Sequence, residues 1–97
     1  MKRIDLLIEE HVMGLNVVNK MVKTYVKDFP TFREPLEYTK DSNLSEKVIQ
    51  SMKLKGFNVN VSSHQEGWIV DFGNNPVIAK SLPLAISVSA LKTLGVE

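Results

Sequence analysis

Hydrophobic residues recur at helical spacing near the C-terminal end of the chain, in residues 81–95. At about 100° per residue they cover an arc of roughly 200° around the helix axis. They are Leu84, Ile86, Val88, Ala90, Leu91 and Leu94. Ser81 is a typical N-cap residue and Pro83 suits the first helical turn. The positions left for water are Ser89, Lys92 and Thr93. We therefore expect this helix either to form the centre of the core or to be half buried in a partner.

Two more segments have the period of an amphipathic helix. In residues 3–13 the apolar face is formed by Ile4, Leu7, Ile8 and Val12, and the acidic residues expected off that face are Asp5, Glu9 and Glu10. His11 falls within the apolar stripe, and we interpret this lone histidine as a residue packed at the edge of the core rather than a ligand. In residues 41–55 the predicted buried face is Leu44, Val48, Ile49 and Met52. Gly14 and Gly56 are placed to end the two helices.

Strand-like alternation dominates the stretch between the second and third helices. Apolar and polar residues alternate from Phe57 to Ser62, and residues 68–72 are expected to point Trp68, Val70 and Phe72 inward, with Ile69 and Asp71 outward. Residues 76–80 form a third strand that begins with a proline. Because the connections are short, we expect an antiparallel three-strand meander.

Residues 15–26 are rich in β-branched side chains and leave two alternatives open. Two short strands around an Asn19-Lys20 turn are favoured by the β-branched residues and by Gly14. A helix is the competing interpretation, since Val18, Val22 and Val26 recur every four residues.

Residues 28–40 contain two prolines and no steady period, which predicts a long loop. Loops of this length in a compact domain are often functional. The aromatic residues of this loop serve either to pin it to the core or to form a contact surface. The candidate contact residues are Phe29, Phe32, Arg33 and Tyr38, together with Trp68 from the meander.

Composition is that of one ordinary globular domain, residues 1–97, with 43% hydrophobic and 24% charged residues. No apolar run approaches the roughly 18 residues of a membrane span, and the first residues do not form a signal peptide. We expect a cytoplasmic protein that does not contact a membrane. The net charge is only +1, and the sequence has no dense stripe of basic residues like that of a nucleic-acid binder. Both observations argue against nucleic acid as the partner. Lys23 and its neighbours Lys20 and Lys27 are interpreted as solvated charges rather than as a phosphate-binding row.

Candidate chemistry is sparse. The one constellation worth testing for acid-base catalysis is His64, Glu66 and Asp71, but alternation places Asp71 on the solvent face. The two histidines lack metal-ligand spacing, the chain has no cysteine, and its five glycines form no phosphate-binding loop. We therefore expect neither an enzyme nor a bound cofactor or metal.

Several short segments together carry a family resemblance. They are Glu10-His11-Val12-Met13-Gly14, Tyr38-Thr39-Lys40-Asp41, Lys55-Gly56-Phe57, Gly67-Trp68, Pro83-Leu84-Ala85-Ile86 and Ala90-Leu91-Lys92. In order and spacing this set resembles the phage ABA sandwich domain, a family of small phage and prophage proteins. The resemblance implies a small sandwich of helices and an antiparallel sheet, and a bacterial cell as the host. It implies no catalytic residues.

The predicted fold is α+β, in the order helix, β-hairpin, helix, three-strand meander, helix. The leading functional hypothesis is a non-enzymatic phage or prophage accessory protein that binds a host or phage protein, and a homodimer is compatible with it. The alternative is a protein that sequesters a nucleotide-like ligand in a pocket formed by Lys23, Arg33 and Trp68. A third hypothesis, an enzyme that uses His64, requires an acid within hydrogen-bond reach of that side chain.

Overall fold

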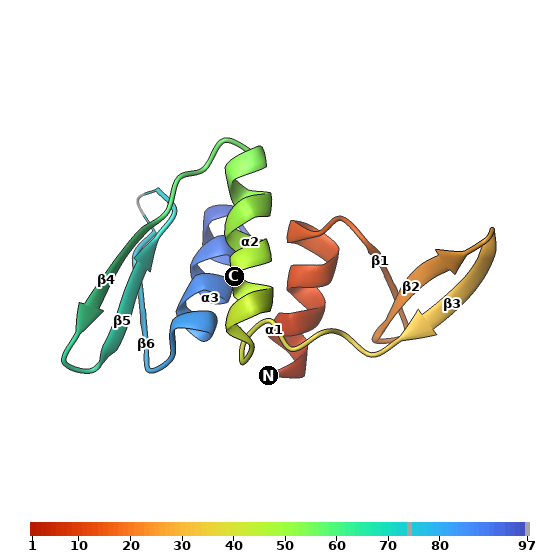
Figure 1. Cartoon of the computed structure of the whole chain (residues 1–97), viewed down its shortest axis with the longest axis horizontal. Coiled ribbons are helices and arrows are strands. Elements are labelled where there is room, and N and C mark those ends of the chain that lie inside the picture. Colours follow the sequence, from red (N-terminus) through yellow and green to blue (C-terminus); the bar gives the residue numbers. More distant parts are fainter. Residues whose placement is uncertain (74, 97) are drawn as a thin grey trace.

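The computed structural model describes residues 1–73 and 75–96 and measures 46 × 25 × 22 Å along its principal axes. Its elements in chain order are α1 (Lys2–Leu7), the π-helix η1 (Ile8–Val12), β1 (Asn16–Val18), β2 (Met21–Val26), β3 (Phe29–Arg33), α2 (Ser42–Leu54), β4 (Asn60–His64), β5 (Gly67–Asp71), β6 (Val77–Ala79) and α3 (Leu82–Thr93). The helices lie in the middle, with the sheet of β4, β5 and β6 on one side and the sheet of β1, β2 and β3 on the other (Figure 1). The α+β class and the element order are confirmed, with one strand more than predicted.

Helix α3 is the centre of the core, as one of the two sequence interpretations requires. It contacts α2, β5, β6, η1 and α1, and its buried apolar residues are Ala85, Ile86, Ala90 and Leu91. The prediction that Ser89 faces water is wrong. This side chain is fully buried and donates a hydrogen bond from Oγ to the carbonyl oxygen of Asn75 at 3.1 Å. A hydroxyl that is satisfied in this way can be buried at little cost.

The first helix has a second buried face that its apolar period did not predict. Ile8 and Val12 belong to the core, as expected. Asp5 and Glu9 are also buried, however, whereas His11 is exposed and not part of the apolar stripe. The π-helical turn is the physical reason for the difference at His11: the amide of Met13 donates to the carbonyl of Ile8, five residues back, so the residues of this turn depart from the 3.6-residue period.

Sheet β4-β5-β6 is antiparallel, as predicted, and covers α3 with its inner face. Val70 and Phe72 are buried and Trp68 is half buried against the core. The predicted strand at residues 57–62 begins later, at Asn60. Phe57 and Val59 instead lie in the connection from α2 and pack against the core from there.

The β-hairpin interpretation of residues 15–26 is confirmed and the helical one is wrong. Asn19 and Lys20 take positive φ values of 51° and 62°, the conformation of a two-residue hairpin turn that matches strand twist. The predicted loop is wrong for residues 29–33, which form β3. Lys27 and Asp28, with φ values of 49° and 71°, make a second turn of the same kind without a glycine. Pro30 is compatible with β3 because that strand lies at the edge of its sheet.

Two leucines at contrasting positions test the central role of α3. Leu91 is fully buried in α3, while Leu54, at the end of α2, is 91% exposed. We expect Leu91→Ala to lower the free energy of unfolding by about 2–5 kcal/mol, because it removes buried methyl groups and leaves a cavity.

The matched control is Leu54→Ala, which is expected to change that free energy by less than about 0.5 kcal/mol. Urea denaturation followed by circular dichroism measures both variants. Equal effects of the two substitutions would contradict the assignment of α3 as the centre of the core.

Candidate functional site

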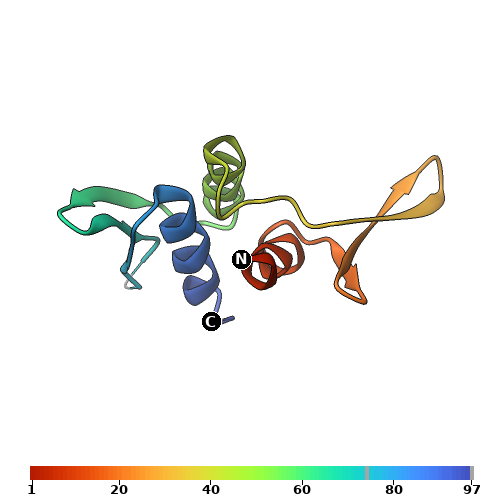
Figure 2. The ribbon, with the colours of Figure 1, turned by 90° about the horizontal axis from the view of Figure 1, so that it is seen from below.

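The pair of strands β2 and β3 projects from the helices, and we call it the arm (Figures 1 and 2). Strand β1 pairs with β2 only from Met21 to Lys23. From Thr24 to Val26, β2 pairs only with β3, so the outer half of the arm is a two-stranded ribbon. In both views no other element lies beside this outer half.

Both faces of the arm carry exposed hydrophobic side chains. Val26 pairs with Phe29 and therefore lies on the same face, where Phe29 is 73% exposed. Tyr25, 59% exposed, lies on the other face, as does Phe32, which pairs with Lys23 and is 52% exposed. Apolar side chains of this size are normally buried, so their exposure marks the arm as the strongest candidate for a contact surface.

The arm has little apolar packing of its own and is held together by polar contacts. In its middle, the hydroxyl oxygens of Thr24 and Thr31 lie 2.8 Å apart across the two strands. The ammonium group of Lys23 lies 5.5 Å from the centre of the Tyr25 ring, within the range of a cation–π interaction.

At its base, the arm is anchored to the body by the buried carboxylate of Glu9. One carboxylate oxygen accepts hydrogen bonds from the Arg33 guanidinium at 2.6 Å and from the backbone amide of Leu36 at 3.1 Å. The other accepts from the Tyr38 hydroxyl at 2.8 Å. Glu9 is fully buried, and charge-assisted bonds to a buried carboxylate are among the stronger hydrogen bonds in proteins. Glu9 thus fixes the end of β3 and the connection that follows it.

The surroundings of Glu9 also change the ionisation of its partners. Burial and the hydrogen bond to Glu9 raise the pKa of Tyr38, so its hydroxyl stays protonated and continues to donate. The same carboxylate raises the pKa of the Arg33 guanidinium through the hydrogen bond that it accepts. Both shifts keep the donors in the protonation state that the anchor needs.

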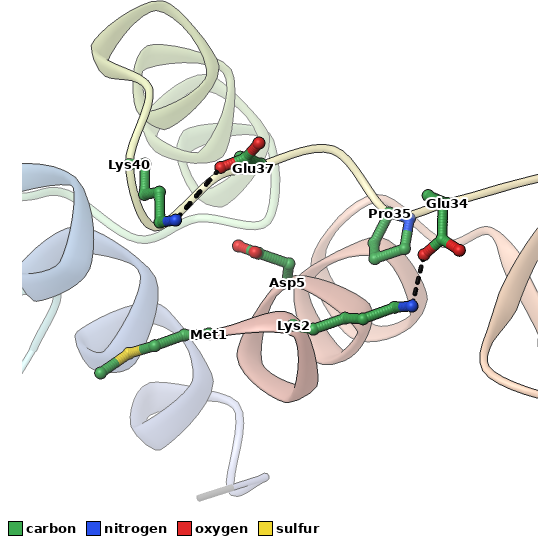
Figure 3. Close-up of a pocket in the computed structure, with 7 residues that line it drawn as sticks. All are labelled: Met1, Lys2, Asp5, Glu34, Pro35, Glu37 and Lys40. Atoms are coloured by element: carbon green, nitrogen blue, oxygen red, sulfur yellow. Dashed lines mark ion pairs between the residues drawn. The ribbon is translucent and has the colours of Figure 1, made fainter.

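One turn before Glu9, Asp5 forms a second anchor. Its carboxylate accepts a hydrogen bond from the backbone amide of Thr39 at 2.9 Å. Burial raises the pKa of Asp5, and the bond from Thr39 opposes that rise. Asp5 borders a small cavity of about 290 Å³, which the ion pairs Lys2–Glu34 and Lys40–Glu37 flank (Figure 3). The acidic groups here are thus engaged in holding the connection from β3 to α2.

A larger open cavity, of about 560 Å³, lies at the base of the arm between α1 and the turn that joins β1 to β2. Leu6 and Leu7 supply its apolar part, and its basic residues are Lys2, Arg3 and Lys20. We call it the basic cavity. A cavity with apolar side chains and a positive charge at its border suits a ligand that has both an apolar part and a negatively charged group.

The structure separates the five predicted contact residues. Phe29 and Phe32 are exposed on the arm, whereas Tyr38 is only 3% exposed and Arg33 is paired with Glu9. Trp68 lies on β5, in the sheet on the other side of the helices from the arm (Figure 1). The expected pocket of Lys23, Arg33 and Trp68 therefore does not form.

The remaining candidates do not assemble into a catalytic site. His64 pairs with Gly67 while Asp71 pairs with Asn60, so His64 and Asp71 lie at opposite ends of the β4–β5 ladder. The Nδ1 atom of His64 accepts from the amide of Glu66 at 3.3 Å, and the Asp71 carboxylate accepts from the amides of Gly73 and Asn75. These contacts shape turns. His11 is exposed, away from His64 in the sequence and on a different element.

The functional residues that sequence reasoning missed are Glu9, Asp5 and Tyr25. Asp5 and Glu9 lie four residues apart on one helix, a spacing that places both on one face. This spacing was a usable signal for a shared role, but it did not show which segment supplies the donors. Tyr25 lies two residues after Lys23 on the same face of β2, and the β-branched pattern of this segment does not show that its side chain is exposed.

Within residues 1–73 and 75–96, no group of three or more acidic, histidine or cysteine side chains is placed to hold a metal ion. In the same residues, no helix is long and apolar enough to cross a membrane.

Comparison with known proteins identifies a shared fold. The crystal structure of a phage protein from Bacillus cereus ATCC 14579 superimposes with a TM-score of 0.80 and 20% sequence identity, over 99% of this chain and 88% of that one. A scan against protein-family models finds no match, and neither does a search of curated proteins. The chain therefore shares its overall fold with a protein of phage origin at low sequence identity.

The anchor can be tested by removing its charge. We expect Glu9→Gln to lower the free energy of unfolding by about 2–4 kcal/mol, because Arg33 loses its partner and a buried hydrogen-bond network is broken. The control is Glu10→Gln, at the exposed neighbouring position, with an expected change below about 0.5 kcal/mol. Urea denaturation measures both, and a Glu9→Gln protein as stable as the control would show that the carboxylate does not anchor the arm.

Proposed function

We propose that this chain is a non-enzymatic phage or prophage accessory protein that binds a protein partner of the phage or the host through the arm. The observation that carries the proposal is the exposure of Tyr25, Phe29 and Phe32 on a ribbon that is anchored to the body. The proposal places the protein in the cytoplasm of a bacterial host.

The physical argument begins with the stability of the arm. A two-stranded ribbon is marginally stable in water, and exposed apolar side chains add no stability to it. Three hydrogen bonds to Glu9 nevertheless hold its base in one position. A projecting, anchored and apolar ribbon is the kind of element that binds a partner by covering its side chains or extending its sheet.

Residue chemistry favours a protein partner over a nucleic acid. Aromatic residues are enriched at protein–protein interfaces. Of the cations on the arm, Lys23 lies over the Tyr25 ring, Arg33 is paired with Glu9, and Lys27 lies in the exposed turn next to Asp28. Few of its charges therefore remain for phosphates, which dominate nucleic-acid affinity.

Phage origin rests on two likenesses. The fold of the B. cereus phage protein and the sequence segments that resemble the phage ABA sandwich domain both support it. Asp71 lies at the opposite end of the β4–β5 ladder from His64, and the His64 Nδ1 atom accepts from the backbone amide of Glu66, which supports a non-enzymatic role.

Site-specific photo-crosslinking in the bacterial host tests the proposal. We expect a photoreactive phenylalanine analogue at position 29 or 32 to cross-link the chain to a discrete protein other than itself. The Phe29→Ser variant is expected to bind the partner weakly. An excess of wild-type chain without the photoreactive group should therefore compete for the partner and abolish the adduct, whereas an excess of the Phe29→Ser variant should not.

The control position is Ile78, which is exposed on β6 at the other end of the molecule. Adducts that form equally from position 78, or an arm that yields no adduct with another protein, would contradict the proposed function.

A second candidate function is the sequestering of a small anionic ligand, and the basic cavity is the observation that favours it. Lys20, next to the apolar side chains of Leu6 and Leu7, would suit a nucleotide-like molecule with a phosphate and an apolar ring. This site replaces the pocket of Lys23, Arg33 and Trp68 that the structure does not form.

A thermal-shift screen with nucleoside mono-, di- and triphosphates tests the second candidate. A ligand at 100 times its dissociation constant adds about 2.7 kcal/mol to the stability of the folded state, which raises the melting temperature measurably. The shift should be lost in Lys20→Asn, which keeps a residue tolerant of the turn conformation. No shift with any nucleotide would remove this candidate.

A further inference from the structure

The arm and β1 form one sheet, and one face of this sheet points away from the helices. On β2 and β3, Val22 is fully buried and its partner Arg33 binds Glu9, so these two side chains point toward the body. Lys23 and its partner Phe32 are the adjacent residues on the two strands. Because successive side chains of a strand alternate between its two faces, Lys23 and Phe32 point away from the body.

We call the face that carries Lys23 the outer face. The register of the three strands places apolar and aromatic side chains around this lysine. The residues of the outer face are Val18, Met21, Lys23, Tyr25, Pro30 and Phe32, with Asn16 opposite Lys23 on β1. Val18, Tyr25 and Phe32 are exposed to solvent. An apolar surface that stays open to water in this way is typical of a protein-binding site.

The charge of the outer face is positive and unpaired. Of the side chains on this face, all of them within the described part of the chain, only that of Lys23 is charged. Among the described residues, no carboxylate lies within ion-pair distance of Lys23. The acidic residues nearest to the arm strands in sequence lie beside other cations: Glu34 pairs with Lys2, and Asp28 lies in the tip turn next to Lys27.

A partner that covers the outer face must also cover Lys23. Tyr25 lies two residues further along β2 and Phe32 lies opposite on β3, so a surface that buries both rings also removes water from the ammonium group. An ammonium group that loses water without gaining an acceptor is strongly unfavourable. A carboxylate on the partner removes this penalty. The Tyr25 ring, 5.5 Å from the ammonium group, holds the cation in place for it.

Two other modes of binding fit the outer face less well. Strand addition at the free edge of β3 is opposed by Pro30, which has no amide to donate. Nucleic acid presents a row of phosphates, and its affinity for a protein grows with the number of phosphates that are neutralised. The outer face offers one cation, which matches one carboxylate.

From these observations we infer that the partner of the arm is a protein with an acidic side chain set in an apolar surface: its carboxylate pairs with Lys23, and the apolar surface covers Tyr25 and Phe32. The inference rests on the proposed function, a protein partner bound through the arm, and adds the chemistry that this partner presents. Lys23 then determines specificity, because an apolar surface without an acidic group leaves its charge unpaired on binding.

Charge reversal at Lys23 tests the inference in the bacterial host. A photoreactive phenylalanine analogue at position 32 lies opposite Lys23, so we expect it to form an adduct with the partner. Lys23→Glu in the same chain should reduce the yield of this adduct about tenfold or more, because attraction becomes repulsion. Lys23→Arg keeps the positive charge and should keep the adduct.

The matched control is Lys27→Glu, which makes the same change of charge in the exposed tip turn of the same arm. Position 27 is roughly 13 Å from Lys23 along the strand, beyond the screening length of about 8 Å at physiological ionic strength. The adduct yield of this control should stay within about twofold of the wild-type yield. Equal losses in Lys23→Glu and Lys27→Glu would overturn the inference, and urea denaturation verifies that both variants are folded.

A zero-length cross-linker identifies the group that binds Lys23. The protein trapped from position 32 is purified and mixed with the wild-type chain, and a carbodiimide then joins amines to carboxylates that are in ion-pair contact. We expect peptide mass spectrometry to find Lys23 joined to an aspartate or glutamate of the partner. Lys23→Arg should lose this product and still form the photo-adduct. A partner joined to other lysines of the chain but not to Lys23 would overturn the inference.

Failure of the inference is distinguishable from failure of the proposed function. A protein adduct that forms from position 29 but not from position 32, or one that persists unchanged in Lys23→Glu, overturns the inference and leaves the proposed function intact. An arm that forms no adduct from either position, or that is joined only to nucleic acid, contradicts both.

Discussion

The position of the arm depends on one carboxylate, that of Glu9, placed inside the molecule by the first helical segment. Its two oxygens accept from the end of β3, from the following backbone and from Tyr38. These donors lie at the last residue of the arm and on the connection that follows it, while Glu9 lies on a segment that precedes the arm. The single carboxylate therefore ties together the two places where the chain leaves and re-enters the body.

Two kinds of physical interaction hold the two ends of the molecule. The body, built from the helices and the sheet β4-β5-β6, is stabilised by burial of apolar side chains around α3. The arm has exposed apolar side chains and is held by strand pairing, the Thr24–Thr31 contact and the Glu9 anchor. Apolar surface that would otherwise contribute to stability is thus left exposed on the arm.

Periodicity predicted those parts of the fold in which one face is buried. The pattern of α3 and of β5 identified the core, and the β-branched residues before Asn19 identified the first hairpin. Strand β3 was missed because Pro30 interrupts the usual strand pattern and because a Lys-Asp pair lacks the glycine that normally signals a tight turn. In β3, side chains on both faces of the strand are exposed, so its sequence lacks the alternation of buried apolar and exposed polar residues on which strand prediction depends.

Side-chain function was harder to predict than the fold. Asp5 and Glu9 lie off the apolar stripe of their helix, and a local pattern assigns such residues to water. Their hydrogen-bond donors come 24 or more residues later in the chain, beyond the range of any local period. Of the two roles open to the aromatic residues of residues 28–40, Tyr38 has the core-pinning one, and only the fold shows that its hydroxyl donates inward to Glu9.

The π-helical turn at Ile8–Val12 makes the length of the first helix as important as its composition. A π-turn contains one residue more than the α-helical turn that it replaces. Loss of Leu6 or Leu7 would rotate Asp5 by about 100° relative to Ile8 and Val12, and loss of Glu10 or His11 would rotate Glu9 by the same angle relative to Val12. In this segment, conservative substitutions are therefore tolerated more readily than a change of length, since a deletion at these positions would turn a buried carboxylate away from its donors even if every remaining side chain were kept.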